Sequence, residues 1–451
     1  MKKFPTSTWF LFIIPSLIGI FLFMTPLHTA DGWKVPIAIL ANALATFIAP
    51  IISWFTLSVF AVAGIGALIF KFIPQKNAKN PTFSDTLFRV NWFWTITRLI
   101  GLVFASMVVF EYGPSAITNE NTGGLLMNPD GGLVTFLFTI FLFAGLLLPF
   151  LTNFGLLEFF GTMMVYIMRP LFKIPGRSSI DALASWIGDG TIGVLMTSKQ
   201  YELGNYTKKE SAIIATNFSI VSITFCIVVL GTVNLSQYFI PYYLTVILCG
   251  LVLAIIMPRI FPLANKEDTY IDGTQQDLSR EKLPAGYNAF THGLENALSA
   301  AHNNRKVGKF FVDGSKNVLD MWFAVAPIVM AFGTIALVLA EFTSVFKILG
   351  TPFEPILTLL GLPEASEAAQ TMVVGFADMF LPSILGAGIE SEMTRFVIAT
   401  VSVTQLIYMS EVGGLILGTK IPLKFLDLVV IFLLRTLISL PIAAAVAHLI
   451  F

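Results

Sequence analysis

The most informative stretch of this sequence is Lys173-Ile-Pro-Gly-Arg-Ser-Ser-Ile-Asp181-Ala-Leu-Ala-Ser-Trp-Ile-Gly-Asp189-Gly-Thr-Ile-Gly-Val194. It places one proline, four glycines and two aspartates within 22 residues of an otherwise apolar region. Proline and glycine interrupt helices, and an ionisable side chain at the centre of a bilayer costs about 2.5–3.5 kcal/mol on insertion scales. We therefore expect a re-entrant hairpin here, in which two short helices enter the membrane and return to the same side.

A second stretch has the same order of features: Leu362-Pro-Glu-Ala-Ser-Glu-Ala-Ala-Gln370-Thr-Met-Val-Val-Gly-Phe-Ala-Asp378-Met-Phe-Leu-Pro382. With a short gap, the two stretches give three matched pairs, which are Pro175 with Pro363, Asp181 with Gln370, and Asp189 with Asp378. Each stretch leads into a long, polar-spotted span that contains Ile-Ala-Thr, at 214–216 and at 398–400. This agreement predicts an internal repeat rather than two unrelated glycine-rich spans.

The charges beside the two stretches differ in sign. The first stretch is flanked by Arg169, Lys173, Arg177, Lys199, Lys208 and Lys209, and the second by Glu354, Glu364, Glu367, Glu390 and Glu392. Basic residues mark the cytoplasmic side of a membrane, so the two hairpins should open to opposite sides. The expected fold is an all-α polytopic membrane protein with two inverted-topology repeats, each holding a broken (re-entrant) helical hairpin, as in many secondary transporters.

Composition supports a membrane protein. Of 451 residues, 56% are hydrophobic and 12% are charged, about half the charged share of a soluble domain. The 27 basic and 27 acidic residues balance, so nothing favours nucleic acid as a partner. The two cysteines, Cys226 and Cys249, lie in apolar runs and indicate core packing rather than a disulfide or a metal site.

A bilayer core needs about 20 apolar residues per helix. Windows of this kind run near 9–25, 36–70, 92–110, 133–153, 210–231, 239–258, 321–343, 394–416 and 424–449. The window 36–70 is followed by basic residues and holds Pro50, so we expect one long bent helix. The chain divides into N-terminal transmembrane helices (1–132), a first repeat (133–260), a cytoplasmic linker (261–320) and a second repeat (321–451). We expect a multi-pass protein of the cell inner (cytoplasmic) membrane, with a cytoplasmic N-terminus.

Several motifs resemble a known family. They are Arg169-Pro-Leu-Phe, Pro175-Gly-Arg, Trp186-Ile-Gly-Asp-Gly190, Asp378-Met-Phe-Leu-Pro382, Glu390-Ser-Glu-Met-Thr-Arg-Phe-Val-Ile-Ala-Thr400 and Gln405-Leu-Ile-Tyr-Met-Ser-Glu-Val-Gly413. They resemble the Gate, or nucleoside-recognition, domain of concentrative nucleoside transporters, ferrous-iron permeases and spore-maturation membrane proteins, and above all its YjiH-like branch. The resemblance extends from about residue 90 to the end and implies solute transport. The ferrous-iron branch is disfavoured, because the sequence has no Gly-x4-Gly-Lys-Ser/Thr signature and no cysteine-bearing gate.

The matched carboxylates are the first candidates for a site. Asp189 lies between Gly188 and Gly190, where the backbone can break and approach a ligand. Asp378 occupies the matching place in the second stretch. Each carboxylate can hold an amine or a cation; the alternative is that each caps a half-helix. Two such groups near one cavity would repel if both were ionised, so one should hold a proton or a cation.

Further polar side chains lie at matched places. Asp181 and Gln370 either take part in binding or cap the first half of each hairpin. Asn217 and Ser219 lie opposite Thr400 and Gln405, where they can bind a polar solute or Na⁺, or else bond between helices. Glu411 follows late in its span, facing a cytoplasmic vestibule or snorkelling to the surface.

These residues favour a secondary active transporter (permease) for a small polar organic solute, a nucleoside or an amino acid or small peptide, coupled to Na⁺ or H⁺. The alternative is a non-transporting membrane assembly or structural partner of the Gate family. We expect no enzyme, no catalytic residue, no cofactor and no metal site, because the four histidines lie in loops, the linker or the last turn and no HExxH or GxSxG motif occurs. The expected partners are the solute and the lipid bilayer, with a homo-oligomer compatible with both.

Overall fold

The computed structural model of this chain describes residues 4–25, 27–29, 32–73, 82–129, 132–187, 190–218, 221, 223–281, 283, 286–304 and 307–451. Most of these residues are helical, and a short antiparallel hairpin pairs β1 (Leu27–Thr29) with β2 (Gly32–Lys34). The all-α class expected from the sequence is confirmed.

Seven helical stretches of the described chain are long and apolar enough to cross a membrane. They are α1 (Thr6–Met24), α2 (Pro36–Phe72), α4 (Trp92–Val109), α7 (Leu133–Thr152), α13 (Phe239–Ile256), the continuous run of α15 (Val307–Asp320), η5 (Met321–Val325) and α16 (Ala326–Phe342), and α24 (Phe425–Ile450). The protein is therefore a multi-pass membrane protein. As expected, residues 36–70 form one helix, α2, with Pro50 inside it.

Shorter helices fill the space between these spans. They are α3 (Phe83–Phe88), α5 (Ser115–Thr118), α6 (Gly123–Met127), α8 (Leu156–Phe172), α9 (Ser178–Ile187), α10 (Gly190–Glu202), α11 (Lys208–Asn217), α12 (Ile223–Thr232), η1 (Ser236–Tyr238), η2 (Met257–Arg259), η3 (Leu263–Asn265), η4 (Leu278–Glu281), α14 (Ala289–Asn303), α17 (Val345–Gly350), η6 (Thr351–Phe353), α18 (Glu354–Leu359), α19 (Ala365–Ala369), α20 (Thr371–Val374), α21 (Leu381–Gly386), α22 (Glu392–Thr404) and α23 (Val412–Gly418).

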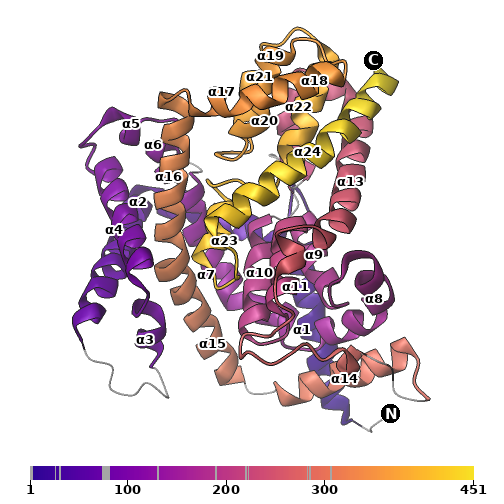
Figure 1. Ribbon diagram of the computed structural model, residues 1–451. Helices are drawn as coiled ribbons and strands as arrows, with labels where there is room; N and C mark the ends of the chain where they lie inside the picture. The colour runs from indigo at the N-terminus through magenta and orange to yellow at the C-terminus, as the bar shows by residue number, and fades with distance from the viewer. Residues whose placement is uncertain are drawn as a thin grey trace.

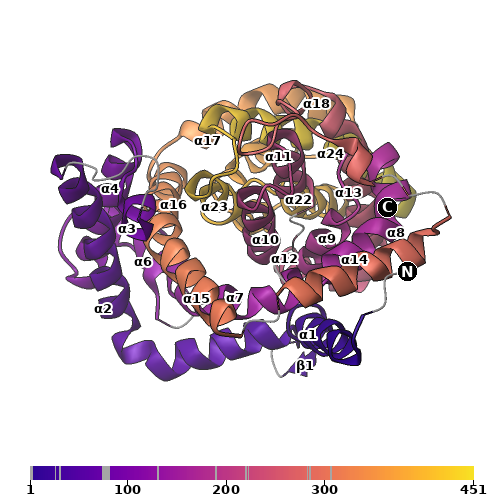
Figure 2. The same cartoon turned by 90° about the horizontal axis from the view of Figure 1, so that it is seen from below.

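The helices form two packed groups. The first contains α2, α4, α7 and the run of α15 and α16, which contact one another and occupy the left side in Figure 1. The second contains the hairpin α9–α10 with α11, α13, α22 and α24. Figure 2 shows α15, α16 and α7 between the α2–α4 edge and this second group. Gly101 permits the close contact of α4 with α16, because a Cβ there would lie 2.1 Å from the carbonyl oxygen of Pro327.

Both expected hairpins consist of short helices. In the first, α9 packs on α10, and in the second, α20 packs on α21. The first lies in the lower half of the molecule in Figure 1 and the second in the upper half. The inverted relation of the two repeats stays a prediction.

Two expected long spans need correction. The windows 210–231 and 394–416 are not continuous helices: the first is divided into α11 and α12, and the second into α22 and α23. Hydropathy alone does not reveal such breaks, because the residues on both sides remain apolar.

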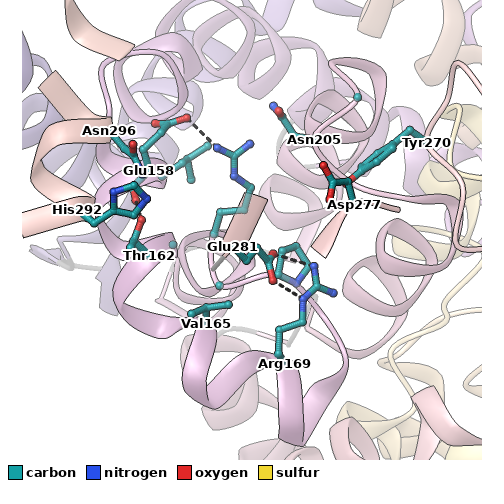
Figure 3. A pocket seen from close by; sticks show the side chains of 16 residues that line it. Glu158, Thr162, Val165, Arg169, Asn205, Tyr270, Asp277, Glu281, His292 and Asn296 are labelled. Atoms are coloured by element: carbon teal, nitrogen blue, oxygen red, sulfur yellow. Dashed lines mark hydrogen bonds and ion pairs between the residues drawn. The ribbon is translucent and has the colours of Figure 1, made fainter. Parts of the chain in front are cut away.

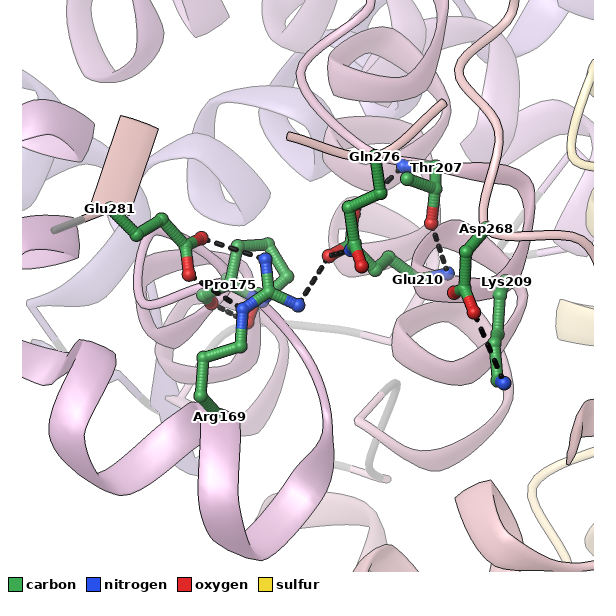
Figure 4. Close-up of polar contacts among 9 residues, drawn as sticks. Arg169, Pro175, Thr207, Lys209, Glu210, Asp268, Gln276 and Glu281 are labelled. Atoms are coloured by element: carbon green, nitrogen blue, oxygen red, sulfur yellow. Dashed lines mark hydrogen bonds and ion pairs between the residues drawn. The ribbon is translucent and has the colours of Figure 1, made fainter. Parts of the chain in front are cut away.

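The linker is fastened to the ends of the membrane helices by charge. Lys208 and Lys209 contact Glu267 and Asp268 at 2.7 and 3.5 Å, and Lys266 contacts Asp427 at the start of α24 at 2.7 Å. Figure 4 shows the Lys209–Asp268 contact beside the contacts of Arg169 with Glu281 and of Gln276 with Glu210. The hydrogen bond from Lys208 lowers the pKa of Glu267 below its usual value, so this pair stays ionised at neutral pH.

The opposite placement of the hairpins generates a topology prediction. Single cysteines at Leu203, in the turn after α10, and at Ser366, in α19, should react with a membrane-impermeant thiol reagent from opposite sides. Both positions are exposed, whereas the native cysteines are fully buried and should not react. A cysteine at the exposed Gly388 should label from the same side as Ser366. Labelling of Leu203 and Ser366 from one side contradicts the inverted arrangement.

Candidate functional site

The first interruption lies at the end of α11. Thr216 and Asn217 donate side-chain hydrogen bonds to the carbonyl oxygens of Ala212 and Ile213, at 2.7 and 3.0 Å. Such bonds to the preceding turn compete with the backbone ladder and bend or end helices. The helix stops at Asn217, and the last carbonyl groups of α11 therefore need partners from elsewhere.

The second interruption follows α22. Residues 405–411 are not helical, and Leu406 adopts a left-handed conformation with φ +61° that is uncommon for a residue with a side chain. The backbone N–H groups of Met409 and Ser410 donate to the carbonyl oxygens of Phe376 and Ala377, at 2.8 and 3.0 Å. The unwound segment and the second hairpin thus satisfy each other's backbone, as non-helical chain at membrane depth requires.

An arginine of α24 joins the two interruptions. Arg435 is 1% exposed. Its Nη1 donates to the Thr216 carbonyl and to the Asn217 side-chain oxygen, at 3.0 and 2.8 Å. Its Nε and Nη2 both donate to the Thr404 carbonyl, at 3.0 and 2.7 Å. Carbonyl groups at a helix C-terminus carry the negative end of the helix dipole, so the ends of α11 and α22 supply the counter-charge for this guanidinium.

Gln405 extends the contact to the second hairpin. Its Nε2 donates to the Met372 carbonyl at 2.7 Å and to the Thr436 hydroxyl at 2.9 Å. Its Oε1 is buried and has no hydrogen-bond partner. That oxygen packs against Gly375, where an added Cβ would lie 2.1 Å from it, so a larger residue at position 375 would displace the Gln405 amide.

Asp378 lies where the second hairpin is unwound. Its Oδ2 accepts a hydrogen bond from the Ser410 hydroxyl at 2.7 Å, and its Oδ1 accepts one from the backbone N–H of Phe380 at 2.8 Å. The side chain is half-buried. Glu411, also half-buried, follows Ser410 in the unwound segment 405–411 and directly precedes α23. The structure therefore brings Asp378 and Ser410 together, and Ser410 was not among the candidates.

Asp181 belongs to a different polar cluster. It is buried between the arms of the first hairpin and accepts hydrogen bonds from the hydroxyl groups of Tyr206 and Thr197, at 2.9 and 3.3 Å. Within the described part of the chain, neither Tyr206 nor Thr197 forms a hydrogen bond with Arg435. The sequence placed Asp181 and Gln370 at matched positions, yet their surroundings differ: Gln370 is half-buried and lines a cavity with Glu364, Glu367 and Glu390.

Three further residues were predicted to bind the solute or ion: Thr400, Asp189 and Ser219. The Thr400 hydroxyl donates to the Phe396 carbonyl within its own helix at 2.9 Å, and its role in binding stays a prediction. Asp189 and Ser219 lie outside the described residues. The proposed pairing of Asp189 with Asp378 therefore stays a prediction.

Sequence reasoning missed the central residue, Arg435. The signal was present, because Arg435 is the one Lys or Arg in the apolar run 425–450 and an intramembrane charge is a functional hypothesis by default. Nothing in the sequence identifies its partners, since two of them are backbone carbonyls 31 and 219 residues away and the third is a side-chain oxygen 218 residues away.

A separate cavity lies where α8, the first hairpin and the linker meet. It encloses about 230 Å³ and is lined mainly by polar side chains. Figure 3 shows Arg169 facing Glu281 and Glu158 facing a second guanidinium, which belongs to Arg177. Both arginines are thus paired within the protein, so this cavity presents no uncompensated cation from either of them.

Comparison with known proteins gives three findings. The sequence model of the Gate family, described as nucleoside recognition, matches residues 134–236 and confirms the resemblance drawn from the sequence. An uncharacterised protein of Alkalihalophilus pseudofirmus is 50% identical over 450 residues, which cover all of this chain and 96% of that protein.

Two solved structures of CNTnw variants in an outward-facing state are also similar. One is 18% identical, with a TM-score of 0.34, and covers 92% of this chain and 98% of its own. The other is 13% identical, with a TM-score of 0.42, and covers 90% and 98%.

The buried guanidinium generates a stability prediction. Arg435→Lys should lower the free energy of unfolding by about 3 kcal/mol or more, because the ammonium cannot reach both helix ends and hydrogen bonds to charged groups contribute roughly 1.5–3 kcal/mol each. Thermal unfolding in detergent measures the loss. The matched control is Arg259→Lys: Arg259 also donates to carbonyls, those of Leu171 and Pro170, but it is exposed and should change stability little. Equal effects of the two substitutions would contradict a central role for Arg435.

Proposed function

This chain belongs to the same family as the Alkalihalophilus pseudofirmus protein and carries a Gate domain, and on that premise we propose that it is a secondary active transporter for a small polar organic solute. The solute is a nucleoside, or an amino acid or small peptide, and transport is coupled to Na⁺ or H⁺. The protein works in the cell inner membrane with its N-terminus in the cytoplasm.

One observation carries this proposal: two interrupted helices have their broken ends gathered on Arg435. Interrupted helices in transporters place backbone groups at the membrane midplane, where a solute can be bound. A protein with only a structural role in the membrane gains nothing from a buried cation with backbone partners, since continuous helices satisfy their own backbone groups. A buried cation and two interrupted helices lower the stability of a membrane protein compared with continuous helices, and this loss is expected where the interruptions serve to bind a solute.

The polar groups beside the interruptions suit a small polar solute. Gln405 offers a buried carbonyl oxygen without a partner, Asp378 offers a half-buried carboxylate held by Ser410, and Asn217 lies at the end of α11. A carboxylate and an amide oxygen can hold an amine, and the amides can hold a sugar hydroxyl or a base edge. The expected binding contributions of Asp189, Asp181, Gln370, Ser219, Thr400 and Glu411 remain proposals.

A ligand screen tests the proposal directly. Purified protein is heated with nucleosides, amino acids and dipeptides, each with and without Na⁺ and at two pH values. A bound solute should raise the melting temperature by mass action, equivalent to about 2.7 kcal/mol at a hundred times its dissociation constant. Proteoliposomes loaded with an ion gradient then show whether that solute is transported. A ligand that binds but is never transported favours the assembly-partner alternative.

The Asp378 carboxylate generates a sharper prediction for an amine-bearing solute. Asp378→Asn keeps the size of the side chain and removes its charge, so the solute should bind about tenfold or more weakly, a loss of about 1.4 kcal/mol. The melting temperature of the free protein should stay close to that of the wild type. The control is Asp427→Asn, which removes a carboxylate paired with Lys266 at the linker. Wild-type affinity in the Asp378→Asn variant would exclude this carboxylate from the site.

A further inference from the structure

The first hairpin encloses an acidic side chain that the site around Arg435 does not use. Asp181 is 1% exposed and lies in α9, facing the second arm of the hairpin. Its Oδ2 accepts hydrogen bonds from Thr197 of α10 and from Tyr206 in the turn that follows. Its Oδ1 is buried and has no hydrogen-bond partner.

A second partnerless group lies one turn along the same helix face. The Ser185 hydroxyl is buried without a hydrogen bond, four residues after Asp181. The two arms are packed closely there, because a Cβ on Gly193 would lie 2.8 Å from the Ser185 hydroxyl oxygen. The tightly packed interface between α9 and α10 therefore contains two polar groups without a hydrogen-bond partner, a carboxyl oxygen of Asp181 and the hydroxyl of Ser185.

No Lys, Arg or His side chain forms an ion pair with this carboxyl group within the described residues. Arg177 attracts it, but the ion pair of Arg177 is with Glu158. Most other charged side chains on the neighbouring elements are also engaged: Arg169 with Glu210 and Glu281, Lys199 with Glu202, Lys208 with Glu267, and Lys209 with Asp268. Lys173, at the end of α8, is exposed. Helix α1, which also packs on α9, has no titratable residue. Among the titratable side chains of the described residues, Tyr206 donates a hydrogen bond to Asp181, at 2.9 Å.

An ionised carboxylate in this place would cost several kcal/mol, because two hydroxyl donors do not replace water around both oxygens. A metal cation would need a shell of several oxygen ligands and room for itself, and among the described residues no group of three His, Cys, Asp or Glu side chains is placed to hold one. A proton needs neither. We infer that Asp181 is a proton-binding site, and that its proton holds α9 and α10 together.

This inference rests on the proposed function, for which it selects H⁺ rather than Na⁺ as the coupling ion. With the proton bound, the arms pack as they do here and the hairpin is closed. When the proton leaves, the carboxylate is stabilised only by water, so the arms must separate to admit it. Proton release on the side where the hairpin opens thus links the movement of α10 to the proton gradient.

Infrared spectroscopy tests the proton without any solute. Wild-type protein in D₂O near neutral pH should show the carbonyl band of a protonated carboxyl group, and Asp181→Asn should lack it. The matched control, Asp427→Asn, removes an ion-paired carboxylate and should keep the band. A band that persists in Asp181→Asn, or is absent from the wild type, overturns the inference even if transport is found.

Hydrogen exchange tests the link to the hairpin. Amide exchange of residues 190–206 is measured by mass spectrometry in the wild type and in Asp181→Asn across a range of pH. The ratio of the two rates cancels the intrinsic pH dependence of exchange, and above the point of proton loss it should rise up to tenfold per pH unit. A ratio that does not change with pH overturns the inference, whether or not a solute has been identified.

A second variant distinguishes a change in proton binding from a loss of folding. Tyr206→Phe removes one hydroxyl donor from Asp181 and keeps the ring, so it weakens the ionised form more than the neutral form. The infrared band should remain and should disappear at a higher pH than in the wild type. Disappearance at the same or a lower pH counts against a proton at Asp181.

Discussion

A guanidinium inside a membrane protein has to be solvated by the protein itself, and the solution found here organises the second group of helices. Arg435 receives its counter-charge from carbonyl oxygens at the ends of α11 and α22 rather than from a carboxylate. Those carbonyls are free only because both helices stop at that depth. The arginine and the two helix breaks therefore stabilise each other, because an unpaired guanidinium and unpaired backbone carbonyls would each raise the free energy of the folded protein in a bilayer.

This mutual requirement explains why the surrounding contacts are so polar. Gln405 follows directly after the Thr404 carbonyl and carries the network to Met372 of the second hairpin and to Thr436 of α24. The unwound segment after α22 then pairs its backbone with residues 376 and 377. Helices α11, α22 and α24 and the second hairpin are thus joined by hydrogen bonds, whereas α4 meets α16 through the close fit of Gly101.

The two acidic groups of the hairpins have different surroundings and so different chemistry. Asp378 accepts a hydrogen bond on each oxygen and is half-buried in an unwound segment. Asp181 is enclosed between two packed arms with one oxygen bare, which suits a neutral group. Burial and missing hydrogen bonds act on the two carboxyl groups to different degrees, which is the basis on which we propose different roles for them. The linker, fastened by exposed ion pairs such as Lys208–Glu267, lies outside both.

The sequence by itself determined the class of the protein, most of the spans, the long helix α2 and the two broken stretches, because hydropathy, proline, glycine and charge act locally. It also selected Asp378, Gln405 and Asn217, since a polar side chain in an apolar run is visible without a structure. Only the tertiary structure decided that windows 210–231 and 394–416 are interrupted, and that Arg435 lies between the breaks. Apart from the Asn217 side chain, its partners are backbone carbonyls, which every residue possesses and no sequence pattern distinguishes. Asp181 and Gln370 occupy matched positions in the sequence, but Asp181 is buried against Tyr206 whereas Gln370 lines a cavity, and this difference depends on what packs around each of them.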